Sequence, residues 1–237
     1  MTCIRSCERL EKGLSWKKAT ELSSKGCGAN MRVIPVGLLT AKGVNLSTIG
    51  AIAQFQSVLT HAHPTALAAS EITAITIAKI LHKVPLENLL DELLKHAEQQ
   101  KKNYRETYLK DIWNRPPFRT AEEFITLGWE QIIEILWKVK EGLQKQDTQT
   151  DPCLIIGAGW IAEEAFATAL YCFLLFPNEP TKALKRAVIT SGDSDSIACL
   201  TGGFSGAYCG IDKFPTDWIN RIEYKNELEL ISSFYES

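Results

Sequence analysis

The strongest constraint on the fold of this chain is the spacing of its apolar residues, which repeats at the period of an α-helix. Apolar residues three or four positions apart share one face of a helix, whereas strict alternation marks a strand. After Pro64 such a stripe is formed by Leu67, Ile72, Ile75, Ile80 and Leu81. After Pro85 a second stripe is formed by Leu86, Leu89, Leu90, Leu93 and Leu94. Strand-type alternation is almost absent, so the sequence predicts an all-α fold.

Capping residues and chain breaks divide this pattern into separate helices. Thr120 and Glu123 form a capping-box pattern, and Ser47 or Thr48 is expected to cap the first long helix. Helices are predicted over residues 46–60, 64–81, from 85 onward, 120–142, 160–176, 179–189, 196–209 and 216–235. A polar linker spans residues 142–152, but the helical pattern continues on both sides of it. We therefore expect one all-α domain over residues 1–237.

Composition and charge argue against several classes of protein. The 26 Lys and Arg residues are balanced by 28 Asp and Glu residues, so no broad basic surface for nucleic acid is expected. The apolar-rich stretch 160–176 contains Glu163 and Glu164 and is predicted to be a buried helix, not a membrane span. The first 14 residues lack the apolar run of a secretory signal. The seven cysteines form no C-x-x-C pair, which favours a reduced, cytoplasmic chain.

The segment 191–196, with the sequence SGDSDS, is the most informative site for chemistry. Asp193 and Asp195 are two positions apart, and Ser196 follows directly. Where the backbone turns into a helix, two carboxylates and a hydroxyl can converge on a hard cation such as Mg²⁺ or Mn²⁺. The alternative is a helix N-cap, in which Asp or Ser accepts hydrogen bonds from free backbone N–H groups. A metal role would require the Asp193 carboxylate to face solvent or metal.

Two further segments are candidates for ligand binding. The glycine-rich loop, residues 24–28, has glycines that let backbone N–H groups face an anion such as a diphosphate, or it is a flexible turn. His61 and His63 are two positions apart and do not share a helix face, so one zinc ion bound by both is not expected. His61 is interpreted either as a hydrogen-bonding partner of a ligand or as a structural histidine.

Taken together, these segments resemble the ADP-ribosylglycohydrolase family, which includes the ADP-ribosylarginine hydrolases and the dinitrogenase-reductase-activating glycohydrolases. The resemblance runs from about residue 23 to the end of the chain, and residues 1–22 match poorly. The matching segments, in order, are GCGANMRVIP, THAHP, GAGWIAEEAFATALY, SGDSDSIACLTGGFSGAYCG and FPTDW.

The resemblance implies an orthogonal multi-helix bundle that hydrolyses the bond between ADP-ribose and a modified side chain at a binuclear Mg²⁺ or Mn²⁺ centre. By position, it makes Asp193, Asp195 and Ser196 metal ligands. It places the phosphates and ribose of ADP-ribose against Ser24, Gly26, Cys27, Gly28 and His61. ADP-ribose or an ADP-ribosylated protein is then the expected partner, and no catalytic residue is assigned.

The sequence also departs from the family pattern. The resemblance implies a Gly-Asp-x-x-Gly segment that ends in a glutamate and a Thr-Asp-Asp-Thr-like metal motif, and neither is found here. The first aspartate is Asp91, and two aspartates are nowhere adjacent. We therefore expect an N-terminally truncated bundle that is weak or inactive by itself. The alternatives are a non-catalytic binder of ADP-ribose or another nucleotide diphosphate, and a structural subunit. A homodimer, or a partner, is expected to cover the open face.

Overall fold

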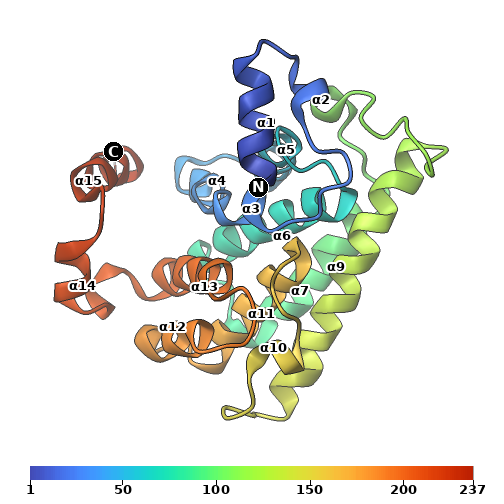
Figure 1. Cartoon of the computed structure of the whole chain (residues 1–237). Coiled ribbons are helices and arrows are strands. Elements are labelled where there is room, and N and C mark those ends of the chain that lie inside the picture. The colour runs from blue at the N-terminus through green and yellow to red at the C-terminus, as the bar shows by residue number, and fades with distance from the viewer. Residues whose placement is uncertain (237) are drawn as a thin grey trace.

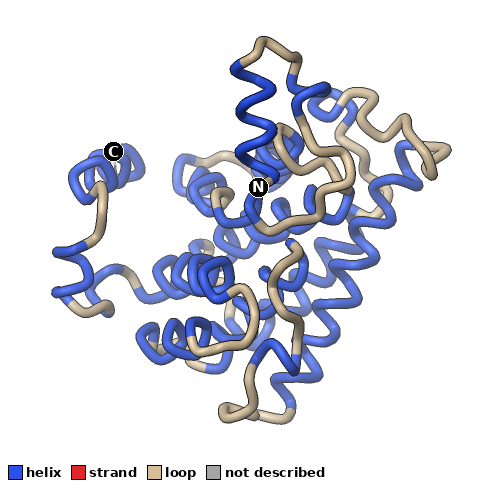
Figure 2. Tube along the Cα trace, viewed as in Figure 1, coloured by secondary structure: helices blue, strands red, loops and turns tan. Residues whose placement is uncertain are grey.

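The computed structural model describes residues 1–236, and its secondary structure is helical. Among those residues β-structure is limited to two isolated bridges, between Glu21 and His61 and between Gly26 and Ile161. The tube in Figure 2 shows helices joined by loops of different lengths. The expectation of an all-α fold is therefore confirmed.

The bounds of the elements follow the chain from the N-terminus. They are α1 (Thr2–Glu11), α2 (Trp16–Ala19), α3 (Gly28–Met31), α4 (Ile34–Leu38), η1 (Leu39–Lys42), α5 (Leu46–Val58), α6 (Pro64–Leu81), α7 (Leu86–Gln100), α8 (Glu106–Leu109), α9 (Ala121–Gln144), α10 (Pro152–Ile155), α11 (Ala162–Leu175), α12 (Pro180–Val188), α13 (Ser194–Cys209), η2 (Ile211–Lys213), α14 (Thr216–Arg221) and α15 (Lys225–Glu236).

Helix α6 is the centre of the fold and packs against α4, α5, α7, α9, α11 and α13 (Figure 1). Its side chains are buried along almost the whole length, including Leu67, Ile72 and Ile75, which are fully enclosed. It is the one helix in the described part of the chain that is long and apolar enough to cross a membrane. Because 94% of that stretch is buried inside the fold, its apolar character is explained by packing.

Most predicted helices are found, with differences at their ends that have local causes. Thr120 caps α9 by accepting a hydrogen bond from the backbone N–H of Glu123 at 3.0 Å, as expected. The cap of α5 is Asn45, two residues before Ser47 and three before Thr48, so the expected cap was wrong. The predicted helix 216–235 is two helices, α14 and α15, which are separated at Tyr224, where φ is +57°. Helix α1 was not predicted, because its sequence is polar and mixed.

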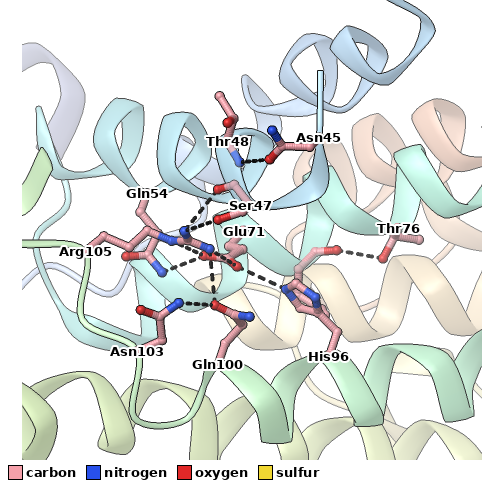
Figure 3. A network of polar contacts seen from close by, with 11 residues as sticks. Asn45, Ser47, Thr48, Gln54, Glu71, Thr76, His96, Gln100, Asn103 and Arg105 are labelled. Atoms are coloured by element: carbon pink, nitrogen blue, oxygen red, sulfur yellow. Dashed lines mark hydrogen bonds and ion pairs between the residues drawn. The ribbon is translucent and has the colours of Figure 1, made fainter. Parts of the chain in front are cut away.

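A buried network of polar side chains ties α5, α6, α7 and α8 together (Figure 3). Glu71 on α6 is fully buried and accepts two hydrogen bonds from the Arg105 guanidinium, Nη2 to Oε1 at 2.7 Å and Nε to Oε2 at 3.1 Å. Gln54 Nε2 donates to Oε2 at 2.7 Å, and His96 Nε2 lies 3.0 Å from Oε1. Burial alone would raise the pKa of Glu71. The hydrogen bond to His96 and the charge and hydrogen bonds of Arg105 outweigh burial and hold that pKa below its usual value.

The C-terminal arm (residues 210–236) leaves the helical body after Gly210, where φ is +76° (Figure 1). It returns to the body only at its far end, where the Tyr235 hydroxyl donates to the Pro35 carbonyl at 3.2 Å. The exposed large apolar side chains of the arm are Ile211, Trp218, Ile222, Tyr224, Leu228, Leu230, Ile231 and Phe234. The arm therefore carries an apolar surface that the described part of the chain leaves open.

Candidate functional site

The glycine-rich loop and the N-terminus of α13 meet, although more than 160 residues separate them in sequence. The Cys27 thiol donates to Asp193 Oδ2 at 3.1 Å and lies 3.1 Å from Ser196 Oγ. All three side chains are buried. We call these three residues the Asp193 cluster. These contacts bring the glycine-rich loop and the start of α13 to one place in the fold.

The loop is fixed to its surroundings on both sides by backbone hydrogen bonds. The Ala162 N–H donates to the Lys25 carbonyl at 2.8 Å, and the His63 N–H donates to the Ser24 carbonyl at 3.3 Å. Lys25 also forms an ion pair with Glu163, whose side chain is buried at the start of α11. The loop is therefore held between α11 and the turn before α6, not free as a flexible turn would be.

Asp193 is positioned by a second loop, residues 157–159. The Asp193 N–H donates to the Ala158 carbonyl at 2.8 Å, and Asp193 Oδ1 accepts the Ser196 N–H at 3.5 Å to cap α13. The carboxylate was expected to face solvent or metal, but the residue is only 6% exposed. Burial is tolerated because Cys27, Ser196 and Asp195 supply polar partners. Asp193 is therefore the N-cap of α13, as one interpretation of the sequence predicted, and it is also the first of the candidate metal ligands.

Asp195 is the exposed member of the motif and interacts directly with Asp193. The hydrogen bond to Asp193 and the negative charge of Asp193 raise the pKa of Asp195 above its usual value. Burial would raise the pKa of Asp193, but its hydrogen bonds to Asp195, Cys27 and Ser196 lower it.

His61 lies against the glycine-rich loop and is only 2% exposed. A β-carbon built on Gly26 would be 3.4 Å from His61 Nε2, and one built on Gly28 would be 3.3 Å from Cε1. Arg32 Nη2 donates to the Thr60 hydroxyl at 2.6 Å, and that hydroxyl lies 2.7 Å from His61 Nδ1. Because the Thr60 hydroxyl already accepts from Arg32, its own proton is available to be donated to Nδ1. We infer that His61 carries its proton on Nε2, on the side of the loop.

Burial, together with the positive charge of Arg32, lowers the pKa of His61 to about 4. Burial, together with the positive charges of Lys25 and Arg115, lowers the pKa of His63 to about 4 as well. His61 is therefore a neutral hydrogen-bond donor at pH 7 and not a cation. His63 has a different task, since its Nδ1 caps α6 by accepting the Thr65 N–H at 3.2 Å.

These pKa values predict a loss of stability in acid. The unfolded chain takes up protons at histidine below about pH 6.5, whereas folded His61 resists protonation until about pH 4. We expect His61 alone to lower the free energy of unfolding by about 2 kcal/mol between pH 7 and pH 5. The check is urea unfolding at both pH values for the parent and for His61→Gln. A variant with the same pH dependence as the parent would contradict this prediction.

One part of the site gave no signal in the sequence. Helix α1 packs against the glycine-rich loop, where Thr2 Oγ1 lies 3.1 Å from Ser24 Oγ. Cys3 accepts from Arg32 Nη1 at 3.3 Å, and its sulfur would be 3.0 Å from a β-carbon on Gly28. Ser24 and Gly28 are therefore contacted by a segment that the resemblance does not cover. No glycine, capping or acidic pattern in residues 1–22 points to this contact.

The donor set fits a divalent metal only in part. Two carboxylates and a hydroxyl are hard oxygen donors, which suit Mg²⁺ or Mn²⁺, and the close pair Asp193–Asp195 is an arrangement that a cation would stabilise. In residues 1–236, however, no three His, Cys, Asp or Glu side chains are grouped as a metal site. A metal held by Asp193, Asp195 and Ser196 would need water for about half of a six-fold shell.

Comparison with known proteins decides the family. The model of the ADP-ribosylglycohydrolase family matches residues 1–237. The chain belongs to the ADP-ribosylglycohydrolase family. The match begins at residue 1 and so includes residues 1–22, which match the family's short motifs poorly.

The relatives of this chain include vertebrate ADP-ribosylhydrolases. The chain is similar to the ADP-ribosylhydrolase ARH3 of Homo sapiens, with 28% identity over 220 residues, 88% of the chain and 57% of the relative. The corresponding protein of Bos taurus is 27% identical over 222 residues, 88% of the chain and 56% of the relative. An uncharacterised protein of Archaeoglobus fulgidus is 26% identical over 98% of the chain and 65% of its own length. The chain thus spans a little over half the length of the ARH3 proteins.

Proposed function

We propose that this chain binds ADP-ribose where the glycine-rich loop meets α13, and that it takes part in hydrolysing the bond between ADP-ribose and a modified side chain. The observation that carries the proposal is the pair of contacts from Cys27 to Asp193 and to Ser196. They join a loop suited to phosphates to the residues suited to a cation. Membership of the family and the likeness to ADP-ribosylhydrolases support the same reaction class.

The chemistry of each group suggests its role in this proposal. Backbone N–H groups of the glycine-rich loop face the diphosphate, and His61 donates from Nε2 to an oxygen of the ligand. Asp193, Asp195 and Ser196 would hold Mg²⁺ or Mn²⁺. When bound, such a metal orients ribose hydroxyls and stabilises developing negative charge. Lys25 remains paired with Glu163 beside the loop and adds a cation near the phosphates.

The proposed activity of the chain alone is weak. General-base catalysis needs a carboxylate or imidazole within hydrogen-bond reach of the attacking water. Glu71 is fully engaged in its buried network, and Glu163 is paired with Lys25. Glu164 accepts the Gly159 N–H at 3.2 Å. None of these three carboxylates belongs to the Asp193 cluster, so binding of ADP-ribose is expected to be easier to detect than turnover.

The test combines calorimetric titration with ADP-ribose and turnover assays on ADP-ribosyl-serine and ADP-ribosyl-arginine peptides in Mg²⁺ and in Mn²⁺. We expect binding that weakens about tenfold in His61→Ala, since a hydrogen bond to a charged group contributes about 1.5–3 kcal/mol. His82→Ala is the matched control. The His82 ring lies outside the glycine-rich loop, and its Nε2 is 2.7 Å from the Thr40 hydroxyl. Binding without turnover would favour the non-catalytic binder, and no binding by the folded chain would overturn the proposal.

A separate prediction concerns the metal. Asp195→Asn should weaken Mn²⁺ binding about tenfold or more without lowering the melting temperature in metal-free buffer. Asp195 is exposed, and an asparagine amide can still donate a hydrogen bond to Asp193, so the change takes away a charged metal ligand but keeps a donor for the buried carboxylate. Asp193→Ala is a poorer probe, because it also removes the cap of α13 and the partner of Cys27. Unchanged Mn²⁺ affinity in Asp195→Asn, measured by calorimetry, would contradict the metal role.

The homodimer stays a prediction. The apolar side chains of the C-terminal arm are the surface that a second copy would cover, and Trp218 and Phe234 are 44% and 59% exposed. A net charge of -2 opposes association only weakly. Light scattering of the full chain checks this, and a monomer at all accessible concentrations would contradict it. A stable dimer without affinity for ADP-ribose would instead favour the structural-subunit alternative.

A further inference from the structure

The first turn of α11 carries two adjacent carboxylates, Glu163 and Glu164. Neighbouring residues of a helix lie about 100° apart around its axis and do not face each other. This geometry argues against a joint acid–base role for the two groups. The same geometry lets each carboxylate contact a different segment of the candidate site.

Glu163 is directed at the glycine-rich loop. Its carboxylate forms an ion pair with the Lys25 ammonium, and Glu163 is buried while Lys25 is half-buried. The main chain supports the same contact, because the Ala162 N–H donates to the Lys25 carbonyl at 2.8 Å. Gly26 also forms an isolated bridge with Ile161. The loop is therefore tied to the start of α11 by a side-chain ion pair and by its backbone.

Glu164 is directed at the second loop, residues 157–159. Its Oε2 accepts the Gly159 N–H at 3.2 Å. Thr168, one turn further along the same face of α11, donates to the Gly157 carbonyl at 2.9 Å. A β-carbon built on Gly157 would lie 2.6 Å from Glu164 Cγ, so the loop packs directly against this side chain. Both ends of the second loop are thus bonded to one face of α11.

Each of these two loops contacts Asp193. The second loop supplies the Ala158 carbonyl, which accepts the Asp193 N–H at 2.8 Å. The glycine-rich loop supplies Cys27, whose thiol donates to Asp193 Oδ2 at 3.1 Å. The spacing between the glycine-rich loop and the start of α13 therefore depends on contacts that originate from one turn of α11.

Burial of the Glu163 carboxylate is costly for the fold. The residue is 5% exposed, and its Oε2 is enclosed without a hydrogen-bond donor. Burial raises the pKa of Glu163, and the ion pair with Lys25 offsets that effect only in part. An apolar side chain at this place would avoid the cost, but it could not hold the Lys25 ammonium.

We propose that Glu163 and Glu164 are positioning residues. Glu163 holds the glycine-rich loop, and Glu164 holds the loop that orients Asp193. Backbone N–H groups and carboxylates bind a ligand well only when they are fixed before it arrives. Glycine-rich backbone loses much conformational freedom when it is fixed, so contacts with α11 are needed to keep the loop ordered. The effect on ligand affinity rests on the proposed function, whereas the effect on loop order does not.

Amide hydrogen exchange of the free, isotope-labelled chain, measured by two-dimensional NMR, tests both contacts without any ligand. In Glu163→Gln the Ala162 amide should exchange about tenfold faster, while the Asp193 amide keeps the parental rate. In Glu164→Ala the amides of Gly159 and Asp193 should exchange about tenfold faster. The Ala162 amide should not change in that variant. Glu164→Gln should behave like the parent, since the glutamine oxygen still accepts the Gly159 N–H.

Calorimetric titration then tests the consequence for each ligand. In metal-free buffer, Glu163→Gln should weaken ADP-ribose about tenfold, and Glu164→Ala should leave that affinity within about twofold of the parent. Mn²⁺ should show the reverse pattern, with a loss of about tenfold in Glu164→Ala alone, because that change releases the loop that orients Asp193. Glu134→Gln is the matched control. Glu134 is exposed on α9 and lines one polar hollow with Glu163 and Glu164, and its variant should match the parent in both titrations.

Three results would overturn the proposal. The first is faster exchange of the Ala162, Gly159 and Asp193 amides in both variants, which a general loss of packing would explain. The second is unchanged exchange in Glu163→Gln or in Glu164→Ala. The third is tighter ADP-ribose binding in Glu163→Gln, which would show that Glu163 withholds Lys25 from the ligand. If the folded parent binds neither ADP-ribose nor Mn²⁺, the proposed function is wrong, and the exchange pattern still decides the positioning roles.

Discussion

Replacing Arg105 by alanine is expected to destabilise the chain by about 3–5 kcal/mol, because the change leaves a buried carboxylate without its cation. Glu71 has no exposed surface, and Arg105 donates to both of its carboxylate oxygens. The remaining partners, Gln54 and His96, cannot replace a guanidinium that binds both oxygens. The measurement is the urea unfolding curve, monitored by circular dichroism.

The control for this experiment is Arg221→Ala, since Arg221 forms an exposed pair with Asp217 at 3.1 Å. Such surface ion pairs contribute no more than about 1 kcal/mol to the free energy of unfolding. If Arg105→Ala fails to fold, Arg105→Lys is the second variant. It preserves the positive charge but not the paired donors of the guanidinium, and its urea midpoint should lie below that of the parent and above that of a chain without the cation. Equal midpoints for Arg105→Ala and Arg221→Ala would show that the network does not stabilise the fold.

Gly192→Ala is expected to lower stability by about 3 kcal/mol and to abolish measurable ADP-ribose binding. A β-carbon on Gly192 would lie 2.1 Å from the Ala158 carbonyl oxygen and 2.6 Å from Cys153 Sγ, so backbone must move to admit it. The Ala158 carbonyl is the acceptor that positions the Asp193 N–H. Displacing it separates Asp193 from Cys27, the contact on which the proposed site depends.

The matched control is Gly206→Ala on α13, where a β-carbon would meet nothing within 4 Å. That change should raise stability by about 0.5–1 kcal/mol, because alanine is the better helix former, and ADP-ribose binding should be retained. The measurements are thermal melting and calorimetric titration of both variants. Retained binding in a folded Gly192→Ala would contradict the proposed geometry.

The sequence by itself determined the parts of this protein that depend on local patterning. Stripes of apolar residues at helical spacing are sufficient to indicate α6 and α7, because one buried face is required wherever such a helix packs. The Thr120 cap is likewise local, since donor and acceptor are three residues apart. The order of the short motifs indicated the family, which the family model confirms over the whole chain.

Tertiary structure alone decided which residues contact each other across long stretches of chain. Cys27 meets Asp193 at a sequence separation of 166, and Glu71 meets Arg105 at a separation of 34. No periodicity encodes such pairs, because each depends on how whole helices pack. For the same reason, the sequence left Asp193 open between cap and ligand, and only packing shows that Asp193 caps α13 with a buried carboxylate. The unexpected contact of α1 with the glycine-rich loop is also of this kind, since residues 1–22 carry no local signal for the surface they cover.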